Sequence, residues 1–233
     1  MKFGITQPFD CSYIPENKER LLVYVGSSLY STLDDYEKLL ESGFRRSGDQ
    51  VYRPQCPSCH ACQSLRVPVS QFKESKSQKR ILNKNKDIEC RISRQNKPEY
   101  YELYARYIEE RHADGSMYPP TPEQFLDFLR NNWAPPLFIE LICEGKIAAV
   151  AVTDELRNSL SALYTFYDPD LESRSLGTLA ILHQIKKAQA MGKEYVYLGY
   201  QIDTSRKMNY KRKFLPNEQY IDHRWVSFQK KCV

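Results

Sequence analysis

The chain has 233 residues, of which 41% are hydrophobic and 27% charged, a balance typical of a soluble globular protein. No stretch approaches the roughly 18 apolar residues of a membrane span, and the N-terminus lacks the apolar core of a signal peptide. We therefore expect a cytoplasmic protein without a membrane partner. The seven cysteines are an odd number, and the net charge of +5 matters mainly where basic residues cluster.

The first half of the chain predicts short strands around one helix. Thr32 is placed to cap this helix with Asp35 three residues later, and Gly43 is placed to end it. The expected strands cover residues 21–25, 44–52 with a turn at 47–49, 65–69 and 88–93. Residues 76–85 are basic and predict either a helix or a loop.

The second half predicts two helices followed by a recognisable order of strands and helices. Pro98 begins the first helix, and Thr121 with Gln124 predicts a capping box at the second. Residues 137–226 then predict three antiparallel strands, a long helix, a strand, a short basic helix and a last strand at 219–226. This order is typical of a GNAT acyltransferase core. The predicted fold is α+β, with a GNAT-like mixed sheet flanked by helices, and a loose boundary near residue 95 divides regions 1–95 and 96–233.

Three cysteines in the spacing C-x2-C-x2-C form the most unusual local pattern. Thiolates at Cys56, Cys59 and Cys62 could converge on zinc or on an iron–sulfur cluster, both of which normally take four protein ligands. Cys11 is the natural fourth ligand, or His60 in the case of zinc. The alternative is a compact loop that carries free thiols.

A helix N-terminus near residue 176 resembles a phosphate-binding loop only in part. Acyl-CoA sites of this fold use the pattern Arg/Gln-x-x-Gly-x-Gly/Ala, in which backbone N–H groups face the pyrophosphate. Arg174 and Gly177 fit the first two positions, but Leu179 occupies the third. An acetyl-CoA-dependent N-acyltransferase is therefore an alternative that this sequence disfavours.

The stretch from Tyr197 to Lys211 combines aromatic and basic residues at a predicted strand end. Ligands bind at such ends in open α/β sheets, and rings among lysines suit an unpaired nucleotide end. The alternative is a basic surface turn with half-buried tyrosines. The residues concerned are Tyr197, Gly199, Tyr200, Asp203, Lys207, Tyr210 and Lys211.

Several motifs together resemble those of the arginyl-tRNA–protein transferase family, and specifically its bacterial aspartate/glutamate leucyltransferase branch. They run in order over nearly the whole chain. The motifs are Gly43-Phe-Arg-Arg-Ser-Gly48, Tyr52-Arg-Pro54, the cysteine triplet with Ser64-Leu-Arg-Val-Pro68, Ser75-Lys-Ser-Gln-Lys-Arg80, Tyr167-Asp-Pro169 with Ser175-Leu-Gly177, and Lys207-Met-Asn-Tyr-Lys211.

The resemblance implies duplicated GNAT-like modules and transfer of leucine from leucyl-tRNA to proteins that begin with Asp or Glu, which marks them for N-degron degradation. The arginyl branch carries a Cys-Gly-Tyr-Cys pair tied to an iron–sulfur cluster. This chain has Cys11-Ser-Tyr-Ile14 there, so any cluster would have to recruit Cys56, Cys59 or Cys62.

Transfer of an aminoacyl group from tRNA to an α-amine is aminolysis of an ester. Positioning of the amine against the ester could supply most of the rate, so we expect no cofactor to be required for the chemistry. The general base is expected at Asp203, Asp168 or Tyr200. Acceptor recognition is expected at Arg53 with Tyr52, Lys76 and Arg80. The tRNA end is expected to contact Tyr197, Gly199, Lys207, Tyr210, Lys211, Arg174 and Gly177. The alternative is that the acceptor and tRNA assignments of the basic residues are exchanged. A second alternative, from another class, is a non-catalytic RNA-binding module folded around a metal.

Overall fold

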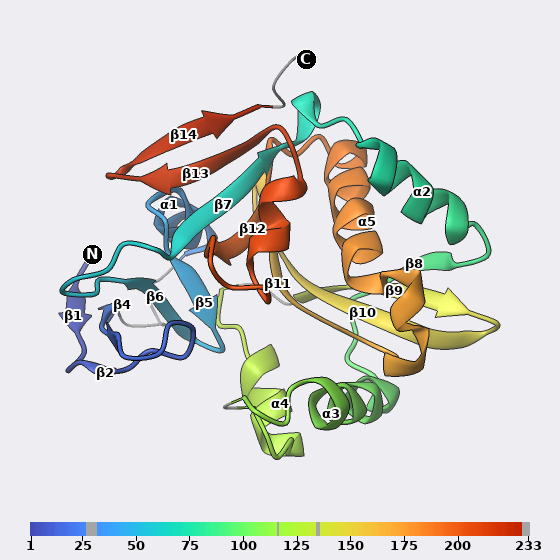
Figure 1. Cartoon of the computed structure of the whole chain (residues 1–233), viewed down its shortest axis with the longest axis horizontal. Helices are drawn as coiled ribbons and strands as arrows, with labels where there is room; N and C mark the ends of the chain where they lie inside the picture. The colour runs from blue at the N-terminus through green and yellow to red at the C-terminus, as the bar shows by residue number, and fades with distance from the viewer. Residues whose placement is uncertain (27–31, 116, 134–135, 230–233) are drawn as a thin grey trace.

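The computed structural model describes residues 1–26, 32–115, 117–133 and 136–229. An eight-stranded mixed sheet forms its centre, in the strand order β14-β13-β7-β12-β11-β10-β9-β8 (Figure 1). Within it, β11 and β12 run parallel, whereas the other neighbouring pairs are antiparallel. The strands are β7 Gln63–Pro68, β8 Glu89–Ser93, β9 Pro136–Cys143, β10 Lys146–Glu155, β11 Ser159–Tyr167, β12 Tyr195–Gln201, β13 Asn217–Ile221 and β14 Arg224–Phe228.

Helices cover both faces of this sheet. Because side chains alternate along a strand, Phe138 and Val150 pack on the face of α3 and α4, whereas Ile139 and Ala149 pack against α5. Helix α2 lies beside α5 (Figure 1). The helices are α1 Leu33–Glu41, α2 Lys76–Lys84, α3 Pro98–Arg111, α4 Pro122–Leu129 and α5 Leu176–Ala190, with short 3-10 segments η1 Val69–Gln71, η2 Pro169–Arg174 and η3 Asn209–Lys213.

The N-terminal region adds a smaller antiparallel sheet in the order β1-β4-β6-β5. The chain then enters the large sheet through β7, which lies between β12 and β13, and β8 forms the far edge. The expected boundary near residue 95 therefore does not separate the two sheets. The N-terminal strands are β1 Phe3–Ile5, β4 Leu21–Tyr24, β5 Arg45–Ser47 and β6 Gln50–Pro54, with a ribbon of β2 Phe9–Asp10 and β3 Lys18–Glu19.

The predicted α+β mixed sheet flanked by helices is confirmed. Within the described residues the large sheet is the one mixed sheet, and the N-terminal sheet is antiparallel throughout. The single last strand expected at 219–226 is wrong: β13 and β14 form a hairpin there, because Asp222 and His223 adopt positive φ and reverse the chain. No described helix is long and apolar enough to cross a membrane.

Capping residues set the helix starts as the sequence predicts. Thr32 and Asp35 form the complete capping box of α1. At α4 the Thr121 side chain accepts a hydrogen bond from the Gln124 backbone N–H, without the reciprocal bond of a full box. The ambiguous basic segment is a helix, α2, whose first turn is fixed by a capping box between Ser75 and Gln78.

Candidate functional site

The two parallel strands at the middle of the sheet diverge. β11 and β12 pair only where residues 159–161 face residues 195–197. Beyond that point, among the strands that the structure describes, β12 pairs with β7 alone and β11 with β10 alone. We call the diverging segments, residues 162–167 of β11 and 199–201 of β12, the β11–β12 fork. It leaves one backbone edge of β11 without a strand ladder, and a site of this kind can receive an extended ligand.

Arg45 reaches from the N-terminal sheet into this fork. Its Nη2 donates a hydrogen bond to the Leu163 carbonyl oxygen on the open edge of β11. Gly199 lies directly beneath the guanidinium, with φ of +75°, and a Cβ there would lie 2.9 Å from Arg45 Cζ. A glycine is therefore required at position 199, both for its backbone conformation and for the passage of Arg45.

Several tyrosine phenols lie near enough to the Arg45 guanidinium to be affected by its charge. Burial raises the pKa of the phenol in each, and the positive charge of Arg45 acts in the opposite direction. These rings belong to Tyr13, Tyr52, Tyr164, Tyr200 and Tyr210. Tyr164 and Tyr210 are half-buried and Tyr13 is 44% exposed, so one side of the fork opens to solvent.

Tyr200 joins the two sheets instead of presenting a free hydroxyl. Its hydroxyl group lies 3.1 Å from the Gly43 carbonyl oxygen and 3.0 Å from that of Tyr52, and the side chain is 5% exposed. Burial raises the pKa of this phenol well above its ordinary value. In this arrangement the Tyr200 hydroxyl donates a hydrogen bond to a backbone carbonyl oxygen, whereas the expected general base would accept a proton from the substrate.

Lys211 is buried beside the fork. Its Nζ donates to the Tyr200 carbonyl oxygen at 2.6 Å, and only 8% of the residue is exposed. Burial, and then the neighbouring charge of Arg45, lowers the pKa of this amine well below its ordinary value. Lys211 is therefore placed to line the interior of the site and does not face a tRNA phosphate at the surface. Tyr210, next in sequence, packs on the core beside α5.

The two carboxylates expected as bases lie in separate loops. Asp203 is paired with Arg212 at 2.8 Å and is 67% exposed in its side chain. Asp168 caps η2 through the Asp170 backbone N–H and pairs with Arg106 at 3.0 Å. The structure does not bring these two groups together, and each has a local ion pair that accounts for its position.

The expected acceptor-binding cations are also separated. Lys76 and Arg80 lie on the exposed side of α2, whereas Arg53 lies in β6 of the N-terminal sheet, on the opposite side of the molecule (Figure 1). The Arg53 guanidinium donates to the Ser42 carbonyl oxygen at 2.9 Å and lies over the rings of Phe44 and Tyr220. Tyr52, also in β6, stays near the fork beside Tyr200.

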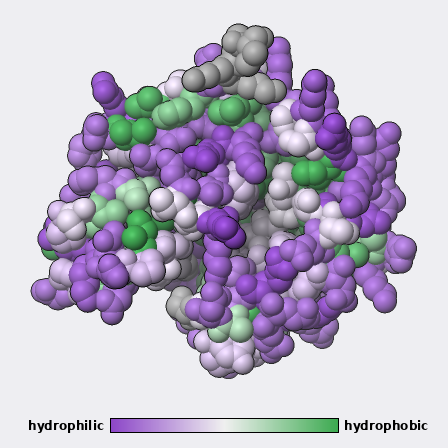
Figure 2. Space-filling model, viewed as in Figure 1, coloured by the Kyte–Doolittle hydropathy of each residue, from purple (hydrophilic) through white to green (hydrophobic). Residues whose placement is uncertain are grey.

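A basic surface extends from α2 to η3. Gln78 on the inner side of α2 donates to the Lys213 carbonyl oxygen, which places η3 next to this helix. Hydrophilic side chains cover the right edge of Figure 2, where α2 lies. The α2–η3 basic surface consists of the exposed residues Lys73, Lys76, Lys79, Arg80 and Lys213, none of which is ion-paired within the described part of the chain.

Other residues expected at the tRNA end have local structural partners. Lys207 pairs with Asp114 at 2.9 Å on the surface. Arg174 pairs with Asp87, and this contact joins η2 to the loop after α2. A Cβ at Gly177 would make only ordinary contact with Tyr167, 3.6 Å away, so close backbone approach does not require glycine there.

Tyr197 faces the α1 side of the sheet and is 2% exposed. Its hydroxyl oxygen accepts a hydrogen bond from Arg66, and burial raises its pKa to about 12. Arg66 in turn lies 3.7 Å from the Tyr195 ring centre and 4.2 Å from that of Trp225. This cluster stabilises the packing of β12 and leaves Tyr197 outside the fork.

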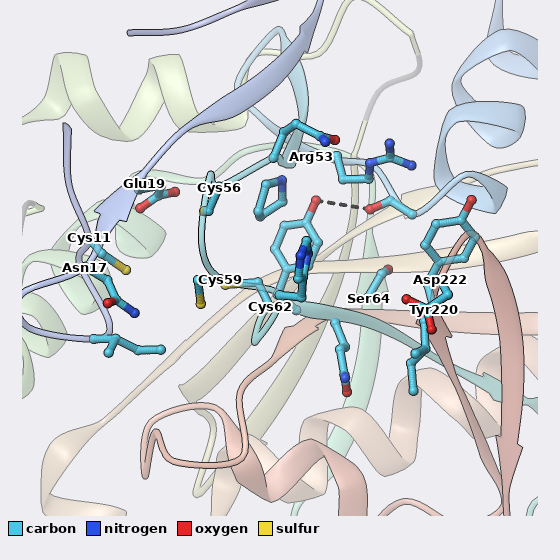
Figure 3. Close-up of a pocket in the computed structure, with 18 of the residues that line it drawn as sticks. Cys11, Asn17, Glu19, Arg53, Cys56, Cys59, Cys62, Ser64, Tyr220 and Asp222 are labelled. Atoms are coloured by element: carbon cyan, nitrogen blue, oxygen red, sulfur yellow. Dashed lines mark hydrogen bonds between the residues drawn. The ribbon is translucent and has the colours of Figure 1, made fainter. Parts of the chain in front are cut away.

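The cysteines line a pocket of about 200 Å³ between the β2–β3 ribbon and the N-terminal end of β7. Figure 3 shows Cys11, Cys56, Cys59 and Cys62 on one side of this pocket, with Arg53 on the other. The four cysteines, contributed by separate segments, thus line the same pocket. The thiols are free.

Their arrangement does not fit a metal centre directly. Among the residues that the structure describes, no three Cys, His, Asp or Glu side chains are grouped so that they could hold a metal ion. Burial, followed by the neighbouring thiols, raises the pKa of Cys62 to about 12, so the thiol form predominates at neutral pH. Metal binding by these cysteines stays a prediction, and no step of a reaction is derived through it.

Sequence reasoning missed Arg45 as a site residue. The motif Gly43-Phe-Arg-Arg-Ser-Gly48 contains two adjacent arginines, and side chains alternate along β5. One of them, Arg46, is buried against Asp154, and Arg45 consequently points to the other face. The alternation was a usable signal, but only the structure shows which face meets the fork.

Comparisons with known proteins cover nearly the whole chain. The family model for the N terminus of arginine-tRNA-protein transferase matches residues 9–80, and that for its C terminus matches residues 99–221. An aspartate/glutamate leucyltransferase of Pseudoalteromonas atlantica is 54% identical over 231 residues, covering 99% of each chain. The protein of the same name from Aeromonas hydrophila is 50% identical and covers 99% of this chain and 97% of its own.

Similarity in structure is more distant and concerns the fold. The C-terminal domain of a putative lysylphosphatidylglycerol synthetase from Agrobacterium fabrum superposes with a TM-score of 0.51 at 12% identity. The superposition covers 82% of this chain and 62% of that one.

Proposed function

The chain belongs to the arginine-tRNA-protein transferase family, as the sequence motifs predicted, and from this membership we propose that it transfers leucine from leucyl-tRNA to proteins that begin with Asp or Glu. The observation that carries the proposal is the match to aspartate/glutamate leucyltransferases at 54% and 50% identity over 99% of this chain. Such transfer would mark the acceptor for degradation through an N-degron pathway.

The reaction joins the acceptor's α-amine to the leucyl ester. The amine nitrogen attacks the ester carbonyl carbon, a C–N bond forms, and the C–O bond to the 3′-terminal ribose breaks. The amine gives up a proton and the ribose oxygen takes one. An α-amine has a pKa of about 7.7–8.0, so part of it is neutral near pH 7. Positioning of two substrates at one site therefore supplies much of the rate.

The α2–η3 basic surface supports binding of the tRNA. Its cations are exposed and lack ion pairs within the described residues, as phosphate-binding groups should. Segment η3 continues from this surface to Lys211 at the fork. Lys76 and Arg80 are better placed for this role than for acceptor recognition, and we assign them to the tRNA.

Salt dependence tests that assignment. Because each phosphate contact releases counterions, the double variant Lys76→Ala, Arg80→Ala should reduce the slope of log affinity for leucyl-tRNA against log salt by about 2. Lys38→Ala, at an exposed position on α1, is the matched control and should leave the slope unchanged. Equal slopes for the double variant and the wild type would remove the α2–η3 basic surface from the tRNA site.

Asp203, Asp168 and Tyr200 stay predictions as general bases. Loss of a general base lowers kcat by about 10²–10⁴-fold with the fold intact. Loss of the ion pairs of Asp203 and Asp168, or of the hydrogen bonding of Tyr200 to the backbone, acts on stability instead. Single-turnover transfer by Asp203→Asn, Asp168→Asn and Tyr200→Phe distinguishes these cases.

The proposed function is tested by the donor and acceptor together. Labelled leucine or arginine is supplied on its cognate tRNA, with peptides that begin with Asp, Glu, Arg or Ala. We expect label only from leucyl-tRNA and only on the Asp and Glu peptides. Transfer of arginine, or of leucine to Arg- or Ala-initiated peptides at equal rate, would contradict the proposal.

A further inference from the structure

Arg45 is a half-buried cation without a carboxylate partner within the described residues. Its sequence neighbour shows the contrast. Arg46 makes two bonds to Asp154, at 2.7 and 2.6 Å, and its remaining Nη1 donates to the carbonyl oxygens of Gly48 and Arg130. Within the described part of the chain Arg45 makes one hydrogen bond, to the Leu163 carbonyl oxygen, so most of its N–H donors remain for a ligand.

The fold holds this guanidinium in a fixed place. β5 is anchored by the buried Arg46–Asp154 pair, and the absence of a side chain at Gly199 gives Arg45 its path into the fork. The Tyr200 hydroxyl on β12 donates a hydrogen bond to the Tyr52 carbonyl oxygen on β6, and this contact joins the two strands near Arg45. A cation that is positioned before the ligand arrives loses little entropy on binding, which favours selective recognition.

The surroundings favour a single carboxylate over a chain of phosphates. Arg45 is half-buried, and one edge of β11 at residues 162–167 carries no ladder with β12. Such an edge pairs with an extended peptide through backbone hydrogen bonds. The exposed cations that suit phosphates lie instead on the α2–η3 basic surface. The buried side chain next to the fork is an amine, Lys211, which does not repel a carboxylate.

We propose that Arg45 is the residue that reads the acceptor, by pairing its guanidinium with the side-chain carboxylate of the N-terminal Asp or Glu at the β11–β12 fork. This inference rests on the proposed function. The planar guanidinium matches a carboxylate in geometry, and a bidentate pair accepts either side-chain length when the peptide shifts along the open strand edge. Arg53, the residue expected from sequence, is held by Ser42 and by two rings and lies toward the cysteine pocket.

The test compares peptides that differ only at the first residue, as Asp against Asn and Glu against Gln. In Arg45→Gln we expect kcat/KM for the acidic peptides to fall about 100-fold, because a charge-assisted pair is lost. Transfer to the Asn and Gln peptides should change by less than about 3-fold, so the preference for an acid collapses. Arg45→Lys should retain part of that preference, and it also serves if Arg45→Gln fails to fold.

Arg53→Gln is the matched comparison and should keep the preference for Asp over Asn. Gly199→Ala leaves both arginines in the chain but displaces Arg45, and it should lower the same preference. The inference is overturned if Arg45→Gln is folded and keeps the wild-type preference, or if Arg53→Gln loses it. A loss of leucyl-tRNA affinity in Arg45→Gln with the preference intact would assign Arg45 to the tRNA instead, and also overturns it.

A calorimetric measurement separates this inference from the proposed function. Wild-type protein should bind an Asp-initiated peptide more tightly than the Asn-initiated one, and Arg45→Gln should bind both equally. If the wild type transfers no leucine, the proposed function fails, while this binding difference still decides the role of Arg45. Equal binding of the two peptides by the wild type overturns the inference on its own.

Discussion

The buried ion pair between Arg46 and Asp154 offers a quantitative test of how the two sheets are held together. The two side chains are 0% and 1% exposed. Asp154 also accepts hydrogen bonds from Tyr36 at 3.0 Å and from Asn131 at 3.1 Å. Substitution Asp154→Asn keeps the shape but removes the charge, so it leaves the Arg46 guanidinium buried without a counterion.

Leaving one member of a buried pair uncompensated costs about 3–5 kcal/mol. For a chain of this size each kcal/mol lowers Tm by about 2–4 °C, so Asp154→Asn should lower Tm by about 6–20 °C. Replacement of both members, Arg46→Met with Asp154→Leu, removes the stranded charge and should recover much of that loss. The measurement is thermal and urea unfolding at pH 7, followed by circular dichroism.

Asp34→Asn is the control, because Asp34 pairs with Arg157 at the surface, with side chains 49% and 69% exposed. It should change the free energy of unfolding by less than about 0.5 kcal/mol. If Asp154→Asn melts as the control does, the pair does not hold β5 to the large sheet, and the rigid placement of Arg45 loses its support.

Three further predictions concern single side chains. Burial lowers the pKa of Lys211, so between the folded-state and unfolded-state pKa values the unfolded chain binds a proton that the folded chain lacks. The free energy of unfolding should therefore rise with pH in this range, by up to about 1.4 kcal/mol per pH unit. Urea melts at several pH values should show this slope in the wild type and not in Lys211→Met. Ser75→Ala removes the N-cap of α2 and should cost about 1 kcal/mol, seen as a lower urea midpoint; an unchanged midpoint would show that the cap is redundant. Burial raises the pKa of Cys62 to about 12, so at pH 8 its alkylation should be at least 100-fold slower in the folded protein than in urea. Peptide mass spectrometry follows the reaction, and equal rates in the two conditions would refute the burial of this thiol.

Local signals in the sequence predicted most of the secondary structure. The Thr32–Asp35 box, Pro98 and Pro122 mark helix starts that the structure contains, because capping depends on residues close in sequence. The insertion of β7 between β12 and β13 was not predictable in this way. It depends on pairing with strands about 130 and 150 residues later, which no local pattern encodes.

The site was predicted less well than the fold, for a related reason. The sequence suggests a role at the tRNA end for Lys211 and indicates no role for Arg45. Burial of Lys211 follows from the packing of η3 against β12, and the path of Arg45 follows from Gly199, 154 residues away. The structure brings Tyr52, Tyr200 and Lys211 into contact and places Gly199 next to Arg45, but the role of each residue depends on which face its strand presents.

We propose that both substrates meet at the β11–β12 fork. The most direct measurement is a crystal structure with an Asp-initiated peptide and a leucyl-adenosine end in which a stable amide replaces the ester. We expect the Asp carboxylate on the Arg45 guanidinium, with the peptide α-amine beside the leucyl carbonyl at the open edge of β11. A peptide bound in the cysteine pocket, with its carboxylate on Arg53, would contradict it.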